Sequence, residues 1–133
     1  MTTYTGRLIR GAQQTHVARW MELVSNEVTG PQFGVLEALH QNPGLSQADL
    51  CAQLDLDRST VADLVARMSD RGIITRIEHE EDKRRYSISL SSVGEAEYEK
   101  LVPKVENLDR ELTKKLSQSE HDELQRLLKL VVS

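Results

Sequence analysis

The strongest chemical signal in the sequence is the run Asp57-Arg58-Ser59-Thr60, which joins a cation to two short hydroxyl side chains. An acidic residue ahead of such a run is typical of a helix N-terminus, with Asp57 as the cap. Arg58 can bind guanine or phosphate, and Ser59 and Thr60 are short donors that suit phosphates or bases. The run therefore indicates nucleic-acid recognition by the start of a helix. The competing interpretation is a simple helix cap beside a solvated basic face.

A second basic cluster, Lys83, Arg84 and Arg85, lies between two segments in which polar and apolar residues alternate. An arginine on a thin loop can enter a narrow minor groove, and Asp82 can pair with Arg84 and hold it in position. The competing interpretation is a surface ion pair, which contributes little to stability. Residues 58–85 carry seven Lys and Arg against six Asp and Glu, whereas the rest of the chain carries ten against fifteen. The basic side chains thus gather where DNA would lie.

Four residues near the N-terminus, Arg10, Gln13, His16 and Trp20, share one side of a predicted helix with Val17, within an arc of about 120°. Arg10 and His16 are about 9 Å apart along the helix axis. A planar acid can bridge them, because arginine binds a carboxylate at two points, histidine binds a ring hydroxyl and tryptophan packs on a ring. The spacing alone favours a simpler interpretation, in which this side contacts other helices and Trp20 belongs to the core.

Other chemistries have little support in the sequence. Cys51 is the single cysteine, which excludes a disulfide framework, and its apolar neighbours indicate a core position rather than a redox sensor. The four histidines lack the spacing of metal ligands, and the serines lack a His and Asp framework for nucleophilic catalysis. We therefore expect no catalytic residue, no metal and no cofactor, and we expect that the protein is not an enzyme.

Apolar periodicity divides the chain into helices and one hairpin. Ser46 and Asp49 suit a capping box, Gly72 suits a left-handed helix end, and Pro103 is expected to kink a long helix. The predicted helices cover 5–28, 31–42, 46–54, a segment from Asp57 to Arg71, 92–115 and a last segment after Ser117, and the predicted strands cover 73–77 and 86–90. A short helix, a tight turn, a second helix and a charged hairpin predict a winged helix-turn-helix, in a fold that is mainly α with a small β-hairpin.

The composition fits this fold class. The chain has 133 residues, enough for one domain with a real core, and its net charge of −4 excludes a histone-like or polybasic protein. Hydrophobic residues make up 38% and charged residues 29%, as in helix-rich globular proteins. No apolar run suits a membrane span, and the N-terminus lacks the apolar stretch of a signal peptide. We expect a protein of the cytoplasm that does not associate with a membrane.

The apolar stripes of the first helix and the last two helices exceed what a small winged domain can cover. Leu101, Val105, Leu108 and Leu112 repeat at spacings of four, three and four, which suits packing against another helix. This excess predicts a homodimer, and the alternative is a monomeric helical hairpin.

The sequence resembles the MarR family of transcriptional regulators across essentially its whole length. The resemblance is carried by QFGVLEAL at 32–39, PGLSQADL at 43–50, LDLDRSTVADLVARMSDRGIITR at 54–76 and DKRRYSISLS at 82–91. It implies one domain over 1–133, in which 1–30 and 92–133 form the dimerisation helices and 31–91 forms the winged helix-turn-helix core. It also implies an obligate homodimer on a palindromic DNA operator, usually a repressor that a small ligand releases.

The resemblance assigns roles to individual residues. The start of the second helix would serve the major groove, the hairpin tip the minor groove, and the start of the preceding helix the backbone phosphates. The DNA-binding residues expected on this basis and from the polar helix face are Ser46, Gln47, Arg58, Ser59, Thr60, Asp63, Arg67, Lys83, Arg84 and Arg85.

The pattern R-x-x-Q-Q-x-H-x-x-x-W at 10–20, followed by T-x-P-Q-F at 29–33, resembles MarR regulators that sense aromatic or phenolic carboxylates such as protocatechuate. The resemblance implies that Arg10 holds the carboxylate and His16 lines the pocket, with Arg7 and Arg19 as possible substitutes. It predicts a benzoate-, hydroxybenzoate- or cinnamate-type effector and regulated genes of aromatic catabolism. Ligand wedged between the dimer helices and the winged domain would fix a recognition-helix spacing that no longer suits adjacent grooves.

Three alternatives remain open at this point. The first is a MarR-type repressor with another effector, in efflux or stress response. The second is a winged-helix protein-interaction module without DNA binding, against which the intact basic residues argue. The third is an enzyme that acts on an aromatic acid, for which His16 is the single candidate base near Arg10.

Overall fold

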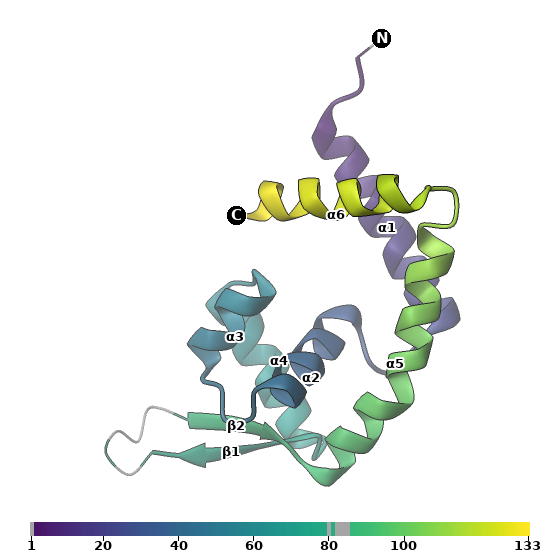
Figure 1. The fold of residues 1–133 in the computed structure, drawn as a ribbon. Helices are drawn as coiled ribbons and strands as arrows, with labels where there is room; N and C mark the ends of the chain where they lie inside the picture. Colours follow the sequence, from purple (N-terminus) through teal and green to yellow (C-terminus); the bar gives the residue numbers. More distant parts are fainter. Residues whose placement is uncertain (1, 80, 82–85) are drawn as a thin grey trace. The chain divides into compact units, whose positions relative to one another are not determined.

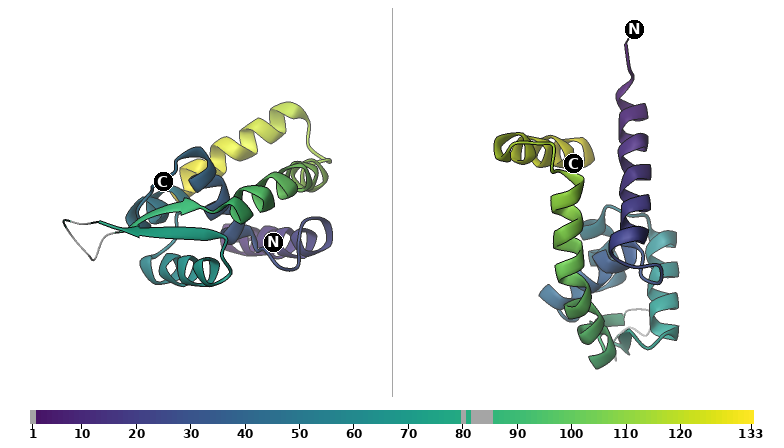
Figure 2. Two further views of the ribbon diagram at one scale, coloured as in Figure 1. Left: turned by 90° about the horizontal axis from the view of Figure 1, so that it is seen from below. Right: turned by 90° about the vertical axis from the view of Figure 1, so that its right-hand side faces the viewer.

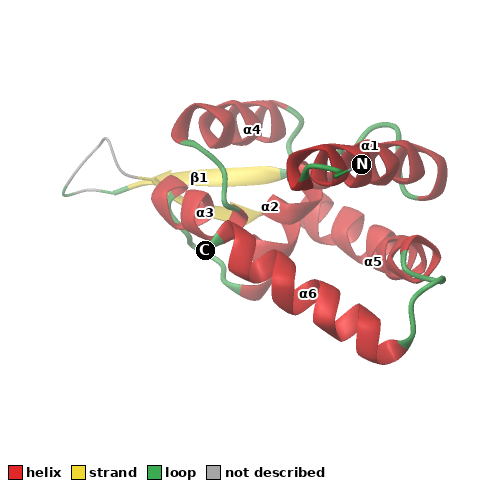
Figure 3. Cartoon of the chain, turned by 90° about the horizontal axis from the view of Figure 1, so that it is seen from above, coloured by secondary structure: helices red, strands yellow, loops and turns green. Residues whose placement is uncertain are grey.

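The computed structural model describes residues 2–79, 81 and 86–133. Helices form most of the described chain, and one antiparallel hairpin accompanies them (Figures 1 and 3). This confirms the predicted fold class. No helix in the described ranges is both long and apolar enough to cross a membrane. The elements in chain order are α1 (Thr5–Leu23), α2 (Gly30–Gln41), α3 (Gln47–Leu54), α4 (Arg58–Asp70), β1 (Ile74–Glu78), β2 (Tyr86–Leu90), α5 (Ser92–Leu112) and α6 (Gln118–Val132).

The chain forms two compact units. One, the helical unit, consists of Met1–Asn26 and Pro103–Ser133, and the other, the winged unit, consists of Glu27–Val102. The winged unit contains α2, α3, α4, the hairpin and the first half of α5, which together form the predicted helix-turn-helix and wing.

Local capping sets the start of the helices in the winged unit. Ser46 Oγ accepts a hydrogen bond from the amide of Asp49, and the Asp49 carboxylate accepts one from the amide of Ser46. Thr29 and Gln32 form the same reciprocal pair at α2, with Pro31 in its first turn. These bonds satisfy backbone donors that the first helical turn leaves open. The capping box predicted at Ser46 is therefore confirmed.

Two residues with positive φ shape the turns around α4. Asp55, at φ 54°, makes the turn between α3 and α4, a conformation that aspartate tolerates better than most residues. Gly72, at φ 72°, follows α4, where the amide of Ile73 donates to the carbonyl of Met68. The left-handed end predicted at Gly72 is confirmed.

The hairpin is tied to the helix-turn-helix through Leu45. Its register pairs Ile74 with Leu90 and Glu78 with Tyr86, and β1 begins one residue later than predicted. Figure 2 shows the two strands of the hairpin side by side. The amide of Ile88 donates to the carbonyl of Leu45 at 2.8 Å, and the amide of Gly44 donates to the carbonyl of Ile88 at 2.9 Å. A two-stranded hairpin is marginal alone, and these bonds anchor it beside the start of α3.

The core of the winged unit draws on every element around it. Its most completely buried side chains include Val35, Leu36, Leu39, Leu50, Val61, Val65, Met68, Ile88 and Leu101. The start of α5 closes one side at Gly94, where an added Cβ would lie 2.1 Å from the carbonyl oxygen of Ile73. This close approach fixes α5 against the loop that leads into the wing.

In the helical unit, the predicted first helix is five residues too long. The structure ends α1 at Leu23 rather than at residue 28, and the amides of Val24 and Ser25 both donate to the carbonyl of Trp20. The apolar spacing continued because Val24 and Val28 are buried in the irregular segment that follows. The helical spacing of apolar residues therefore extends beyond the end of the helix, because the residues that continue it are buried without being helical.

The last two helices leave much apolar surface exposed. Helix α5 continues through Pro103 and ends at Leu112, three residues before the predicted end, and Leu108 is buried. Helix α6 has no buried residue in this chain, and its apolar side chains are 39–61% exposed. These side chains are Leu124, Leu127, Leu128, Leu130, Val131 and Val132.

Candidate nucleic-acid interface and effector residues

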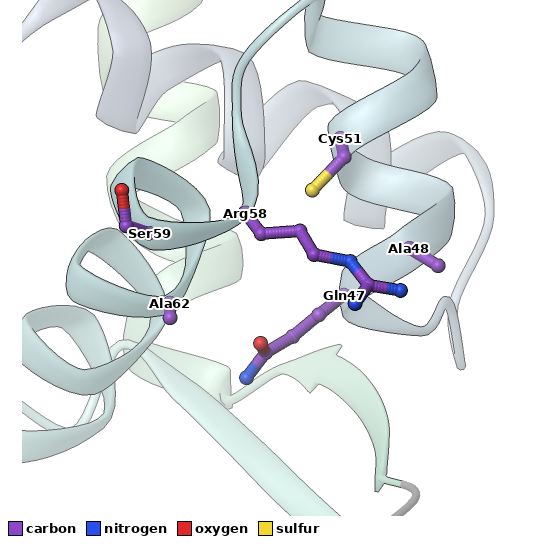
Figure 4. Close-up of a pocket in the computed structure, with 6 residues that line it drawn as sticks. All are labelled: Gln47, Ala48, Cys51, Arg58, Ser59 and Ala62. Atoms are coloured by element: carbon purple, nitrogen blue, oxygen red, sulfur yellow. The ribbon is translucent and has the colours of Figure 1, made fainter.

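An open hollow lies between α3 and the start of α4, with a volume of about 490 Å³. Its lining residues are Gln47, Ala48, Cys51, Arg58, Ser59 and Ala62. Figure 4 shows the Arg58 side chain extending from the start of α4 across the hollow toward α3. The structure thus brings together Gln47, Arg58 and Ser59, three of the residues predicted to bind DNA, on one face.

The N-terminus of α4 is organised by Asp57. Its carboxylate accepts hydrogen bonds from the hydroxyls of Ser59 and Thr60, each at 2.5 Å, and from the amide of Thr60 at 3.4 Å. The side-chain bonds from Ser59 and Thr60 lower the pKa of Asp57 from 3.8 to about 2. Asp57 is therefore ionised at neutral pH, and it does more than the helix capping that the sequence indicated.

Further along α4, Arg67 pairs with Asp63. Arg67 Nε lies 2.9 Å from Asp63 Oδ2, and both side chains are exposed. Such an exposed pair contributes little to stability. The guanidinium can therefore exchange its carboxylate partner for another acceptor at low cost, and its neighbour on the preceding turn keeps it oriented along the polar side of the helix.

The start of α3 supplies a second set of polar groups. Ser46 caps the helix, as described above, and its hydroxyl oxygen accepts a hydrogen bond from the amide of Asp49. Gln47 is the first residue of α3 and reaches the hollow beside Arg58. Gln47 therefore lies beside the start of α4, and Ser46 precedes it as the cap of α3.

The wing offers one basic residue that sequence analysis did not single out. The guanidinium of Arg76, on β1, lies 5.6 Å from the centre of the Tyr86 ring on β2. The hairpin register, if known, would have placed these two side chains on one face of the sheet. Lys83, Arg84 and Arg85, predicted to form the wing tip, lie outside the residues that the structure describes.

The four effector residues predicted on α1 are only partly brought together. The rings of His16 and Trp20 are 5.9 Å apart, with His16 half-buried and Trp20 6% exposed. Arg10 and Gln13 are exposed. The guanidinium of Arg10 extends back toward Gly6, where an added Cβ would lie 3.4 Å from Nη1. An acid that used all four residues would require the Arg10 side chain to turn toward His16.

Two further findings concern Cys51 and His40, to which the sequence analysis assigned no functional role. Cys51 is half-buried and lines the hollow between α3 and α4, so it is not a fully enclosed core residue. His40 stacks on Tyr98 at 4.3 Å and bonds the Glu95 carboxylate at 2.8 Å, a contact between α2 and α5 that sequence spacing could not reveal. Among residues 2–79, 81 and 86–133, no three His, Cys, Asp or Glu side chains gather to hold a metal ion.

Comparison with known proteins adds sequence and structural relatives. The sequence model of the MarR family matches residues 27–85, all of which lie in the winged unit. The transcriptional regulator HosA of Escherichia coli O127:H6 is 30% identical over 125 residues, which cover 94% of this chain and 92% of HosA.

Solved structures agree with this relationship. PcaV from Streptomyces coelicolor, in complex with its natural ligand, superposes with a TM-score of 0.94 and 32% identity, covering 97% of this chain and 92% of PcaV. BpsR of Bordetella bronchiseptica, whose DNA binding is regulated by 6-hydroxynicotinic acid, superposes with a TM-score of 0.89 and 27% identity, covering 96% of this chain and 98% of BpsR. These relatives are regulators rather than enzymes, and the chain belongs to the MarR family of transcriptional regulators.

Proposed function

We propose that the protein is a cytoplasmic repressor that binds a palindromic operator as a homodimer and is released by a small aromatic carboxylate. The observation that carries the proposal is the open, polar start of α4, where Arg58, Ser59 and Gln47 line one hollow. The major groove admits one helix, and the residues at that helix's N-terminus meet the base edges.

The DNA-binding roles follow from this placement. Helix α4 enters the major groove with Arg58, Ser59 and Thr60 at its leading end, and the Asp63–Arg67 pair follows one turn later. Ser46 and Gln47, at the start of α3, contact the phosphates that border the groove. For Lys83, Arg84 and Arg85 we propose DNA contacts on the basis of the sequence, with Arg84 in the minor groove.

A second copy of the chain covers the exposed apolar side chains of the helical unit. Leu8, Val17 and Met21 of α1 and the apolar side of α6 are exposed in one chain. An apolar surface of this extent marks an interface in soluble proteins. The dimer axis then presents two α4 helices to two half-sites about one helical turn of DNA apart.

The effector we propose is a benzoate-, hydroxybenzoate- or cinnamate-type acid that binds at α1. Arg10 binds the carboxylate, Gln13 and His16 bind polar ring substituents, and Trp20 packs on the ring. The contact between the His16 and Trp20 rings supports an aromatic ligand at this place, as does the action of 6-hydroxynicotinic acid on BpsR. The bound acid favours a dimer whose α4 spacing no longer matches successive grooves, and repression of aromatic catabolism genes ends.

Fluorescence anisotropy of a labelled duplex, taken from the DNA upstream of the protein's own gene, tests both steps. The protein is bound at about 150 mM salt, and benzoate, hydroxybenzoates and cinnamates are then titrated, with the matching benzamides as uncharged controls. We expect tight binding, and release by an acid at micromolar concentration but not by its amide. Failure to bind any duplex would overturn the operator proposal, and binding without release would overturn the effector proposal.

A further inference from the structure

The directions of the hydrogen bonds at the N-terminus of α4 determine which DNA bases this end of the helix can recognise. Ser59 Oγ lies 2.5 Å from Asp57 Oδ2, and Thr60 Oγ1 lies 2.5 Å from Asp57 Oδ1. Ser59 is exposed at the second position of the helix and borders the hollow, whereas Thr60 is half-buried. Ser59 is therefore the hydroxyl that an approaching base meets.

The direction of these two bonds is fixed by the charge of Asp57. With a pKa of about 2, its carboxylate carries no proton at neutral pH and can only accept hydrogen bonds. Each hydroxyl has a single proton, which it donates to Asp57. The Ser59 oxygen consequently offers only lone pairs to an incoming partner.

Donation by Ser59 to DNA would require the loss of a charge-assisted bond. Bonds to an ionised carboxylate are about twice as strong as bonds between neutral groups. Phosphate oxygens, guanine O6 and N7, and thymine O4 are all acceptors, so none of them can pair with the Ser59 lone pairs. The negative charge of Asp57 also disfavours a phosphate at this end of the helix.

The major groove offers two groups that do fit an acceptor. These are the N6 amino group of adenine and the N4 amino group of cytosine. We propose that Ser59 reads an amino base, adenine or cytosine, on the strand that faces it, and that Asp57 is the positioning residue that sets this preference. The inference rests on the proposed function of α4 as the DNA recognition helix.

Selection from a pool of randomised duplexes tests the inference with the full-length chain. The wild type, Ser59→Ala and Ser119→Ala each select bound duplexes, which are then sequenced. Ser119 is a matched control, because it is the second residue of α6 as Ser59 is of α4. We expect one half-site position at which the wild type and Ser119→Ala favour A or C over G or T by roughly fivefold to tenfold. Ser59→Ala should lose that preference.

A single-atom test then follows on the selected duplex. A selected adenine is replaced by purine, which lacks the N6 amino group, or a selected cytosine by pyrimidin-2-one, which lacks the N4 amino group. Wild-type affinity should fall by a similar factor, and Ser59→Ala should bind both duplexes equally, as a double-mutant cycle requires for a direct contact.

The Asp57→Asn variant tests the positioning role. Asparagine caps helices as well as aspartate does, so the fold is retained, but its amide also donates hydrogen bonds and can free the Ser59 proton. The preference for A or C over G or T should narrow to less than about twofold. A preference unchanged in this variant would remove Asp57 from the proposed role.

The remaining outcomes separate this inference from the proposed function. A Ser59-dependent preference for G or T would overturn the inference alone. So would a Ser59→Ala variant that loses affinity uniformly for all sequences with a weaker salt dependence, which indicates a phosphate contact. A wild-type protein that enriches no sequence at all would overturn the operator proposal together with the inference.

Discussion

Arg67 Nε lies 2.9 Å from Asp63 Oδ2 on the exposed side of α4, one helical turn apart. The pair holds a guanidinium on the polar side of the helix that we propose as the recognition helix. Because both side chains are exposed, the pair itself adds little to the folded state. The pair matters because it orients the Arg67 guanidinium.

Arg67→Ala should therefore weaken DNA binding by about 1–3 kcal/mol while changing the free energy of unfolding by less than about 0.5 kcal/mol. Anisotropy titrations at several salt concentrations measure the first quantity, and urea unfolding measures the second. Arg126→Ala is the matched control, since Arg126 forms an exposed pair with Glu123 on α6. An equal loss of DNA affinity in both variants would show that α4 has no special part in binding.

Arg10→Ala should raise the acid concentration for half-release of the operator by more than about tenfold, because a two-point bond to the carboxylate is lost. Operator affinity without acid should stay largely unchanged, since Arg10 lies on α1 and not in the winged unit. Trp20 is the single tryptophan, so its fluorescence also reports acid binding directly. Arg7→Ala is the control, and if that variant loses the response while Arg10→Ala keeps it, Arg7 holds the acid instead.

Leu128→Glu should dissociate the proposed dimer. Leu128 is 47% exposed on α6 in one chain, and burying an unpaired carboxylate in an interface costs several kcal/mol, which raises the dimer dissociation constant at least about a hundredfold. Sedimentation at micromolar concentration measures the mass. Gln125→Glu adds the same charge to the same helix at a polar position and should remain a dimer. A Leu128→Glu variant that keeps the wild-type mass would exclude α6 from the interface.

Gly94→Ala should destabilise the winged unit. The new Cβ would lie 2.1 Å from the carbonyl oxygen of Ile73, so α5 or the loop before β1 must move, at a cost of about 1–3 kcal/mol. Urea unfolding gives the difference. Gly11→Ala is the comparison, because among the described residues a Cβ added at Gly11 would meet no atom within 4 Å other than those of its own stretch of helix. Alanine stabilises a helix interior by about 0.8–1 kcal/mol relative to glycine. Equal stability of Gly94→Ala and the wild type would contradict the close packing at Ile73.

The sequence predicted those parts of the structure that depend on neighbouring residues. Ser46 and Asp49, and likewise Gly72, act within one helical turn of themselves, and their structures match the prediction. The first helix was predicted too long because Val24 and Val28 remain buried in the segment that follows the end of α1. Apolar spacing reports burial, and it cannot report whether the backbone is still helical.

The candidate site divides in the same way. The start of α4 could be predicted, since Asp57, Ser59 and Thr60 are neighbours in sequence and α4 exposes Arg58 beside them. The contact of Arg76 with Tyr86 could not, because it depends on the register of two strands. The structure was also needed to show that the hydroxyls of Ser59 and Thr60 donate to Asp57. The sequence indicates only that both residues can donate hydrogen bonds.

The carboxylate of Asp57 should make the free energy of unfolding depend on pH within a defined acidic range. Hydrogen bonds from Ser59 and Thr60 lower its pKa from 3.8 to about 2 in the folded chain. A carboxyl whose pKa falls on folding stabilises the folded state above its unfolded pKa, and this contribution is lost as the pH falls toward the folded pKa. The contribution of Asp57 is thus complete above about pH 5 and disappears as the pH falls from 3.8 to about 2.

Asp57→Asn removes this titration while keeping a good cap. Urea unfolding at a series of pH values should show that the wild type loses stability more steeply than the variant between pH 3.8 and about 2, whereas the two curves run parallel above about pH 5. Glu120→Gln is the matched variant, because bonds from the amide and hydroxyl of Ser117 lower the pKa of Glu120 at the start of α6. It should flatten the acid dependence through a different helix, so the two effects should add. If Asp57→Asn follows the wild-type curve throughout, Asp57 does not hold the Ser59 and Thr60 protons in solution.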